Sequence, residues 1–169
     1  MRESRCILFD WGNTLMRDFP DAEGPMADWP RVETLPGVKE ILRQLRPHWT
    51  LALATNAVAS SEPAVWRALA RGGIASLLDK VYCFQAIGHK KPAPAFFDYI
   101  VQDLPMDRDR IVMVGDDFEN DIRGATRSGI RSIWLNQSSD EARVGPLYET
   151  IQNLQSLPNA LTSPSTTDT

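Results

Sequence analysis

Residues 111–125 read IVMVGDDFENDIRGA and contain the pattern that decides the fold, an apolar run followed at once by acidic residues. The apolar run has no polar alternation, which is typical of a strand buried on both faces of a parallel sheet. A helix is predicted from about Glu119 to Ser128, because Gly129 stands where a left-handed C-terminal cap belongs. The segment therefore predicts a buried strand, an acidic turn and a helix.

Four further apolar runs of the same kind are predicted strands, at residues 5–9, 50–54, 80–84 and 131–135. Apolar residues at helical spacing lie between them and predict helices near 38–45, 61–71 and 97–104. Parallel strands joined by helices need right-handed crossovers, so the alternation predicts an α/β fold with a doubly wound parallel sheet. Functional loops of such a sheet gather at the carboxyl ends of its strands.

Composition narrows the class of protein. The chain has 169 residues, 43% of them hydrophobic, and a net charge of −4 with no block of like charge. We expect one domain over residues 1–157. The lack of a block of like charge predicts no nucleic-acid partner. No membrane partner is expected, since no uninterrupted hydrophobic run exceeds four residues. The N-terminal residues MRESRCILFD lack the apolar core of a signal peptide, so a cytoplasmic location is expected.

Two segments depart from the alternating pattern. Residues 16–36 hold four prolines and no sustained period, so we interpret them as an ordered loop too short to form a cap domain. Residues 158–169 contain six Ser or Thr and two Pro, which predicts a disordered tail.

The cysteines and histidines carry little chemistry. Cys6 and Cys83 fall in two different predicted strands, and with one strand between them they would be ~10 Å apart, too far for a disulfide. Both are predicted to be reduced and buried. His48 and His89 have no second ligand at zinc spacing, so metal chemistry would have to use carboxylates.

Acidic residues follow two of the predicted strands. Asp10 comes directly after CILF, and Asp116, Asp117 and Asp121 follow IVMVG. Carboxylates gathered at one sheet edge repel one another, and Mg²⁺ is the usual ion that relieves such repulsion. The alternative is that these acids only cap helices, which applies best to Asp121 in the first turn of a helix.

Four ordered motifs resemble those of the haloacid dehalogenase-like (HAD) hydrolase superfamily: FDWGNTL at 9–15, ALATN at 52–56, Lys91-Pro92, and VGDDFENDIRGA at 114–125. The resemblance implies a three-layer Rossmann-like core with a minimal cap, in which residues 16–36 take the cap position. It also implies that the first and fourth strands are neighbours, which would bring Asp10 to Asp116.

The resemblance further implies a role for each matching residue. Asp10 matches the nucleophile that forms an aspartyl-phosphate, Lys91 matches the cation beside it, and Thr55 matches the hydroxyl that binds phosphate. The backbone N–H of Asn56 matches a second phosphate contact. Asp10, Asp116 and Asp121 match the residues that hold Mg²⁺, with Asp117 as an alternate ligand. The alternatives are a simple strand-end turn at Thr55-Asn56 and a solvated Lys91.

One position departs from the family pattern. Phosphatases of the family carry a second aspartate two residues after the nucleophile as general acid and base, whereas this chain has Gly12. The carbonyl of Gly12 can still bind the metal, but the lost acid predicts a slow or specialised enzyme that favours good leaving groups. Asp18 or Glu23 in the irregular loop are candidates to replace it.

Three classes of function remain open on the sequence. The first is a Mg²⁺-dependent phosphatase that acts on a small or bulky phosphorylated substrate, as a monomer or weak homodimer. The second is a different HAD hydrolase, phosphonatase-like or dehalogenase-like. The third is a catalytically weakened HAD fold with a binding or regulatory role. Trp11 and Trp29 are candidates to line the site in each case.

Overall fold

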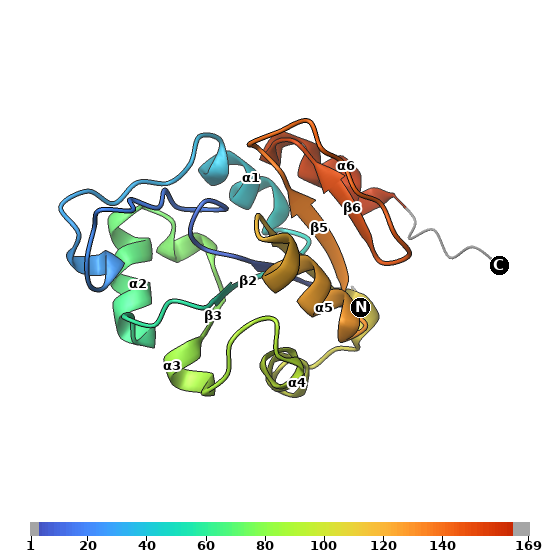
Figure 1. The fold of residues 1–169 in the computed structure, drawn as a ribbon, viewed down its shortest axis with the longest axis horizontal. Coiled ribbons are helices and arrows are strands. Elements are labelled where there is room, and N and C mark those ends of the chain that lie inside the picture. The colour runs from blue at the N-terminus through green and yellow to red at the C-terminus, as the bar shows by residue number, and fades with distance from the viewer. Residues whose placement is uncertain (1–3, 164–169) are drawn as a thin grey trace.

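A computed structural model describes residues 4–163 of the chain and shows a single six-stranded parallel sheet. The strand order is β3-β2-β1-β4-β5-β6, so the chain winds outward from β1 in both directions (Figure 1). The strands are β1 (Cys6–Phe9), β2 (Thr50–Thr55), β3 (Lys80–Cys83), β4 (Ile111–Gly115), β5 (Arg131–Leu135) and β6 (Tyr148–Ile151). The predicted doubly wound Rossmann-like fold is confirmed.

Helices cover both faces of the sheet and make three layers. The α-helices are α1 (Val38–Leu45), α2 (Glu62–Arg71), α3 (Phe84–Ile87), α4 (Pro94–Asp103), α5 (Gly124–Arg127) and α6 (Leu157–Thr162). Short 3₁₀ turns lie at Met26–Asp28, Ala75–Leu77, Arg108–Arg110 and Leu154–Ser156. Side chains of α1, α2 and α6 pack on one face of the sheet, and those of α4 and α5 pack on the other.

Strand β1 shows why the apolar runs do not alternate. Ile7 and Phe9 belong to the core beneath α1 and α2, whereas Cys6 and Leu8 belong to the core beneath α4. All four side chains are buried, because a central parallel strand has no solvent-facing side. Cys6 and Cys83 are both buried and free, as predicted.

The place where the winding reverses sets the functional edge. Strand β1 pairs with β2 on one side and β4 on the other, with Phe9 opposite both Leu53 and Val114. The carboxyl ends of these three strands therefore meet at the topological switch point, where α/β sheets bind ligands. The predicted adjacency of the first and fourth strands is confirmed.

The C-terminal prediction was wrong at its start. Residues 158–162, expected in a disordered tail, belong to helix α6. Strand β6, which precedes this helix in the chain, was not predicted either. Leu157, Ala160 and Leu161 are buried against the core, so this short apolar stripe stabilises the helix despite the polar residues around it. The rest of that predicted tail, residues 164–169, lies outside the described residues.

The loop at 16–36 is ordered, with one 3₁₀ turn at Met26–Asp28. The Arg71 side chain of α2 donates hydrogen bonds to the carbonyls of Ala27 at 2.8 Å and Trp29 at 2.6 Å. The side chains of Met26 and Ala27, which belong to this loop, are buried. The loop is therefore fixed to α2. Among residues 4–163, no helix is both long and apolar enough to cross a lipid bilayer.

Candidate active site

An open cavity of about 430 Å³ lies at the carboxyl edge of the sheet. Segments distant in the sequence contribute to it: the loop after β1, the loop after β2, the segment before α4 and the loop after β4. The predicted site residues all border it, namely Asp10, Gly12, Thr55, Asn56, Lys91, Asp116, Asp117 and Asp121. The two tryptophans proposed to line the site, Trp11 and Trp29, also border it.

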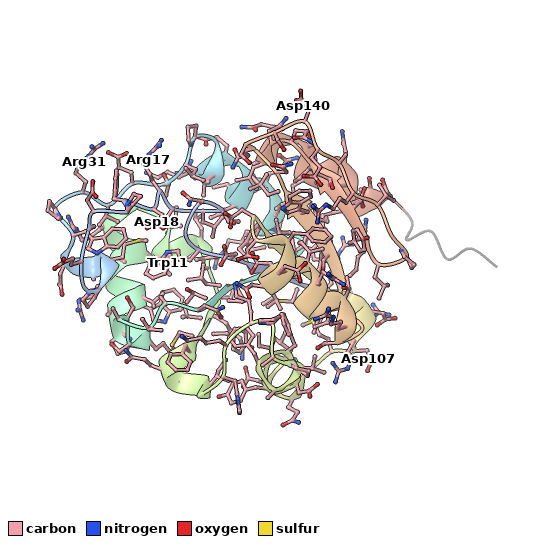
Figure 2. The ribbon with its side chains drawn as sticks, viewed as in Figure 1. Trp11, Arg17, Asp18, Arg31, Asp107 and Asp140 are labelled. Atoms are coloured by element: carbon pink, nitrogen blue, oxygen red, sulfur yellow. The ribbon has the colours of Figure 1, made fainter. Side chains whose placement is uncertain are left out.

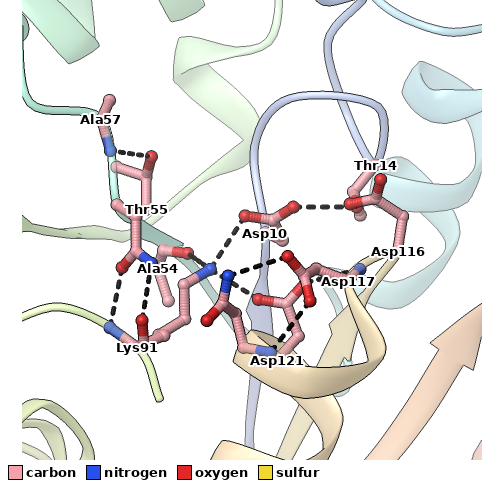
Figure 3. Close-up of polar contacts among 11 residues, drawn as sticks. Asp10, Thr14, Ala54, Thr55, Ala57, Lys91, Asp116, Asp117 and Asp121 are labelled. Atoms are coloured by element: carbon pink, nitrogen blue, oxygen red, sulfur yellow. Dashed lines mark hydrogen bonds and ion pairs between the residues drawn. The ribbon is translucent and has the colours of Figure 1, made fainter. Parts of the chain in front are cut away.

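A buried lysine lies at the bottom of the site (Figure 3). The Nζ of Lys91 donates to Asp10 Oδ1 at 2.8 Å, to Asp121 Oδ1 at 2.7 Å and to the carbonyl of Ala54 at 2.6 Å. These three contacts use every hydrogen of the ammonium group. The lysine is only 3% exposed, so the alternative of a solvated surface lysine is wrong.

Lys91 and the carboxyl groups beside it shift one another's pKa values. Burial disfavours the charged form of Asp10, but the Lys91 charge and hydrogen bonds outweigh it and hold the pKa of Asp10 below its usual value. Burial also opposes the charged form of Lys91, yet Asp10 and Asp121 together raise the pKa of Lys91 above its ordinary value. Asp10 is therefore an anion and Lys91 a cation at neutral pH.

The two acids from the β4 loop titrate in the opposite sense. Burial, the hydrogen bond with Asp10 and the charges of Asp10 and Asp121 raise the pKa of Asp116 to about 8. Burial raises the pKa of Asp121 to about 7, with Lys91 opposing and Asp10 adding to the shift. These shifts indicate excess negative charge at the site.

The donor set fits a divalent cation. Asp10, Asp116 and Asp121 each place one possible ligand oxygen within 4.8 Å of those of the others. With all three ionised, Lys91 offsets only one charge, which leaves two negative charges for a hard, oxygen-seeking ion such as Mg²⁺. The hydroxyl of Thr14 lies 3.4 Å from Asp10 Oδ2 and 3.3 Å from Asp116 Oδ1 and can donate to either.

Backbone contacts hold these acids in place. The Asp10 N–H donates to the carbonyl of Val114 at 2.9 Å, which extends the β1–β4 pairing by one residue. The indole N–H of Trp134 in β5 donates to the carbonyl of Asp116 at 2.9 Å. The Asp117 N–H donates to Asp121 Oδ2 at 3.1 Å. Each carboxylate is thus anchored through the sheet or the adjoining turn.

Gly115 makes room for Asp121, a role that the sequence motifs did not predict. A Cβ on Gly115 would lie 2.1 Å from Asp121 Oδ2 and 2.4 Å from its Cγ. The helix that follows begins as a π-helix, Phe118–Arg123, rather than as the continuous α-helix expected from Glu119 to Ser128. Such π-turns are frequent at functional sites. Here it carries Asp121 back over the end of β4.

Asp117 has a different role from the one expected of it. Its carboxylate accepts hydrogen bonds from the Asn120 N–H at 2.9 Å and from Asn120 Nδ2 at 2.8 Å, and so caps the π-helix. Among the described residues it is outside the group of three acids that could share a metal ion. The capping alternative considered for Asp121 applies instead to its neighbour.

Asn56 contributes its side chain, which the sequence analysis did not foresee. Its Nδ2 donates to the carbonyl of Lys91 at 2.8 Å, and the Lys91 N–H donates to its Oδ1 at 2.8 Å. This reciprocal pair ties the Lys91 segment to the end of β2. The Thr55 Oγ1 accepts from the Ala57 N–H at 3.1 Å and borders the cavity. Thr55 and Asn56 therefore join the cluster, as the order of motifs predicted.

The two candidate replacement acids differ in place. Asp18 borders the cavity close to Gly12, whereas Glu23 is exposed and is not part of the cavity wall. Figure 2 shows Asp18 and Trp11 directed toward the middle of the molecule, whereas Arg17 and Arg31 of the same loop point outward.

Comparison with known proteins identifies the family. The family of haloacid dehalogenase-like hydrolases matches residues 10–135, which contain every site residue described above. This chain belongs to that family. Its HAD core has the pairing of the first and fourth strands and the switch-point site that the four motifs implied.

The curated relatives match only part of this chain. A pyrimidine 5′-nucleotidase, YjjG of Escherichia coli, is 30% identical over 112 residues, which cover 66% of this chain and 48% of the relative. A glyceraldehyde 3-phosphate phosphatase of Methanothermobacter thermautotrophicus is 35% identical over 77 residues, 46% of this chain and 34% of the relative. This chain therefore spans about half, or less, of the curated relatives it matches.

Solved structures are similar over nearly the whole chain. An uncharacterised protein from Listeria monocytogenes serotype 4b superposes with a TM-score of 0.81 and 29% identity, covering 93% of this chain and 96% of the other. This HAD core is thus similar to a solved chain of nearly its own length.

Magnesium is expected to stabilise the folded protein, because an ion that binds only the folded state shifts the unfolding equilibrium. At a concentration ~100 times its dissociation constant the gain is ~2.7 kcal/mol, or roughly 5–10 °C in melting temperature. The shift should be larger near pH ~9 than near pH ~6, because protons compete for acids whose pKa values are raised. Thermal scans with Mg²⁺ or chelator measure it, with Asp116→Asn as the impaired variant and exposed Asp140→Asn as control.

The Gly115→Ala substitution is expected to weaken Mg²⁺ binding by about 10- to 100-fold, as changes that displace a ligand's support typically do. The added methyl group would overlap the Asp121 carboxylate, which must then move away from Lys91. Isothermal titration with Mg²⁺ measures the effect. An unchanged affinity in a folded variant would show that Asp121 does not take part in the metal site.

Proposed function

We propose that this protein is a Mg²⁺-dependent phosphoester hydrolase that acts through an aspartyl-phosphate on Asp10. The observation that carries the proposal is the arrangement of Asp10, Lys91, Asp116 and Asp121 around one open cavity. An ionised carboxylate, a buried cation and a divalent-metal donor set are together suited to phosphoryl transfer. The names of the two curated relatives above, a nucleotidase and a phosphatase, support the same class of substrate.

Each residue has a defined task in this proposal. A carboxylate oxygen of Asp10 attacks phosphorus as the bond to the leaving oxygen breaks, and water later releases phosphate from Asp10. Lys91 keeps Asp10 ionised and aimed, since its ammonium is bonded to Oδ1 of that residue. The Thr55 hydroxyl and the Asn56 N–H would bind phosphate oxygens in the same cavity.

The metal would be held by Asp10, Asp116 and Asp121, with the carbonyl of Gly12 as a further candidate ligand. When bound, Mg²⁺ supplies positive charge that offsets the repulsion between the carboxylates and a phosphate dianion. The residues present favour this task, because the site without an ion has carboxyl groups whose pKa values are raised.

The other hydrolase chemistries fit these residues less well. A phosphonatase-like reaction needs a lysine that is neutral and free to form a Schiff base, but Lys91 is fully hydrogen-bonded and its pKa is raised. Residues 16–36, in the cap position, contain no lysine. A dehalogenase-like reaction would bring a carboxylate substrate to a cluster of three acids, which would repel it. The dehalogenase-like alternative also has no use for the Asp116–Asp121 pair as a metal site.

The Asp10→Asn substitution is expected to lower Mg²⁺-dependent hydrolysis of 4-nitrophenyl phosphate by at least ~10³-fold, because it removes the nucleophilic charge at nearly constant volume. Single-turnover rates measure it, with Asp140→Asn as a control far from the site. Mass spectrometry of acid-quenched wild-type protein should find one phosphoryl group on the peptide that contains Asp10.

Two outcomes would contradict the proposal. Full activity in the Asp10→Asn variant would remove Asp10 from the reaction. A folded wild-type protein that binds Mg²⁺ but releases no phosphate from aryl or acyl phosphates would favour the binding or regulatory class instead.

A further inference from the structure

The empty position at Gly12 has a carboxylate beside it. A Cβ built on Gly12 would lie 3.6 Å from Asp18 Cβ, 3.9 Å from its Cγ and 4.0 Å from its Oδ2. Any side chain at position 12 would therefore point toward the Asp18 carboxyl group. Both residues border the same cavity as Asp10 and Lys91. The Asp18 carboxylate thus lies beside position 12, where the family motif has its second aspartate and this chain has a glycine.

A tight turn brings Asp18 to this place. The N–H groups of Thr14, Leu15 and Met16 lie 3.3, 3.0 and 3.0 Å from the carbonyl of Trp11 and donate to it. Asn13 has φ of 58°, in the left-handed region that asparagine tolerates better than most residues. Its N–H donates to the Met16 carbonyl at 2.7 Å. The chain therefore reverses just after the nucleophile and returns past Gly12.

The backbone on either side of Asp18 is tied down. The Asp18 N–H donates to Asn13 Oδ1 at 3.3 Å, and the preceding Arg17 N–H donates to the Glu33 carbonyl at 2.8 Å. The Arg17 and Glu33 side chains also form an ion pair at 3.4 Å. Asp18 is thus held between the turn and the returning arm of the loop, although its side chain is exposed to the cavity.

The Asp18 carboxylate is also available for chemistry. Within residues 4–163, no hydrogen bond or ion pair engages its side-chain oxygens, whereas those of Asp117 cap a helix and those of Asp121 bond to Lys91 and the Asp117 N–H. Glu23, the other acid considered from the sequence, is outside the cavity wall.

We propose that Asp18 is the general acid and base of this enzyme and takes the place of the aspartate missing at position 12. This inference rests on the proposed phosphoester hydrolysis at Asp10. As Asp10 attacks phosphorus and the P–O bond to the leaving group breaks, the Asp18 carboxylic acid gives its proton to the leaving oxygen and an alcohol departs. The resulting Asp18 carboxylate then takes a proton from water, whose oxygen attacks phosphorus and breaks the P–O bond to Asp10.

The test compares two leaving groups in the Asp18→Asn variant. For an alkyl phosphate such as glycerol 3-phosphate, which needs a proton on its leaving oxygen, kcat/KM should fall by ~10²- to 10⁴-fold. For 4-nitrophenyl phosphate, whose leaving group needs little protonation, kcat/KM should fall by less than ~10-fold. A burst of one nitrophenolate per enzyme should appear, because loss of the base slows release of phosphate from Asp10. Glu23→Gln, a carboxylate removed from the same loop, should retain wild-type rates.

A rescue variant separates chemistry from damage to the loop. Gly12 is not in the left-handed region, and a Cβ there meets only ordinary contact distances, so the backbone at this position accepts a side chain. Adding Gly12→Asp to Asp18→Asn should recover alkyl-phosphate turnover by at least ~10-fold. Melting curves of all variants confirm that they are folded.

The outcomes distinguish this inference from the function beneath it. A wild-type enzyme active on aryl phosphate with an unchanged alkyl-to-aryl ratio in Asp18→Asn would overturn the role of Asp18 and leave the hydrolase standing. An equal loss on both substrates without rescue would do the same. A wild-type protein with no Mg²⁺-dependent activity on the aryl substrate would overturn the proposed function itself.

Discussion

The ammonium group of Lys91, buried between Asp10 and Asp121, is the interaction on which the rest of the site depends. A buried charge is tolerated only when it is paired and fully hydrogen-bonded, and all three hydrogens of this ammonium have acceptors. Removing one partner of such a pair typically costs ~3–5 kcal/mol. The lysine therefore joins the segment after β1, the end of β2 and the segment after β4 into one unit, and it also keeps Asp10 ionised.

The surplus of negative charge around this lysine gives the site its chemistry. Burial raises the pKa values of Asp116 and Asp121, and the negative charge of Asp10 beside them adds to the shift, since within residues 4–163 Lys91 is the one cation in contact with this group of acids. A protein that kept these acids only to cap helices would place them apart, as Asp117 is placed. The close approach instead requires Gly115, since any side chain there would displace the Asp121 carboxylate. Unbalanced negative charge is thus concentrated where a substrate and a cation would enter.

The short loop at 16–36 also forms part of the site. Arg71 and the buried Met26 hold it to α2, so it lies over one side of the cavity. Its first residues return past Gly12 and carry Asp18 there. In the proposed mechanism, Gly12 and Asp18 would together replace the second aspartate of the family motif. The Gly12 carbonyl would bind the metal, and the Asp18 carboxyl group would transfer the proton.

The sequence alone predicted five of the six strands and site residues that border the cavity. Uninterrupted apolar runs predict strands β1 to β5, and the resemblance of the motifs at Asp10, Thr55, Lys91 and Asp116 to those of the family implies that these residues meet. Only the tertiary structure decided how the side chains divide the tasks: Asn56 binds the Lys91 backbone and Asp117 caps a turn. It also decided that β6 and α6 form and that Asp18, not Glu23, borders Gly12. Apart from the Asp117 cap, which is a local contact with Asn120, these features come from contacts between distant segments, which local periodicity and composition do not encode.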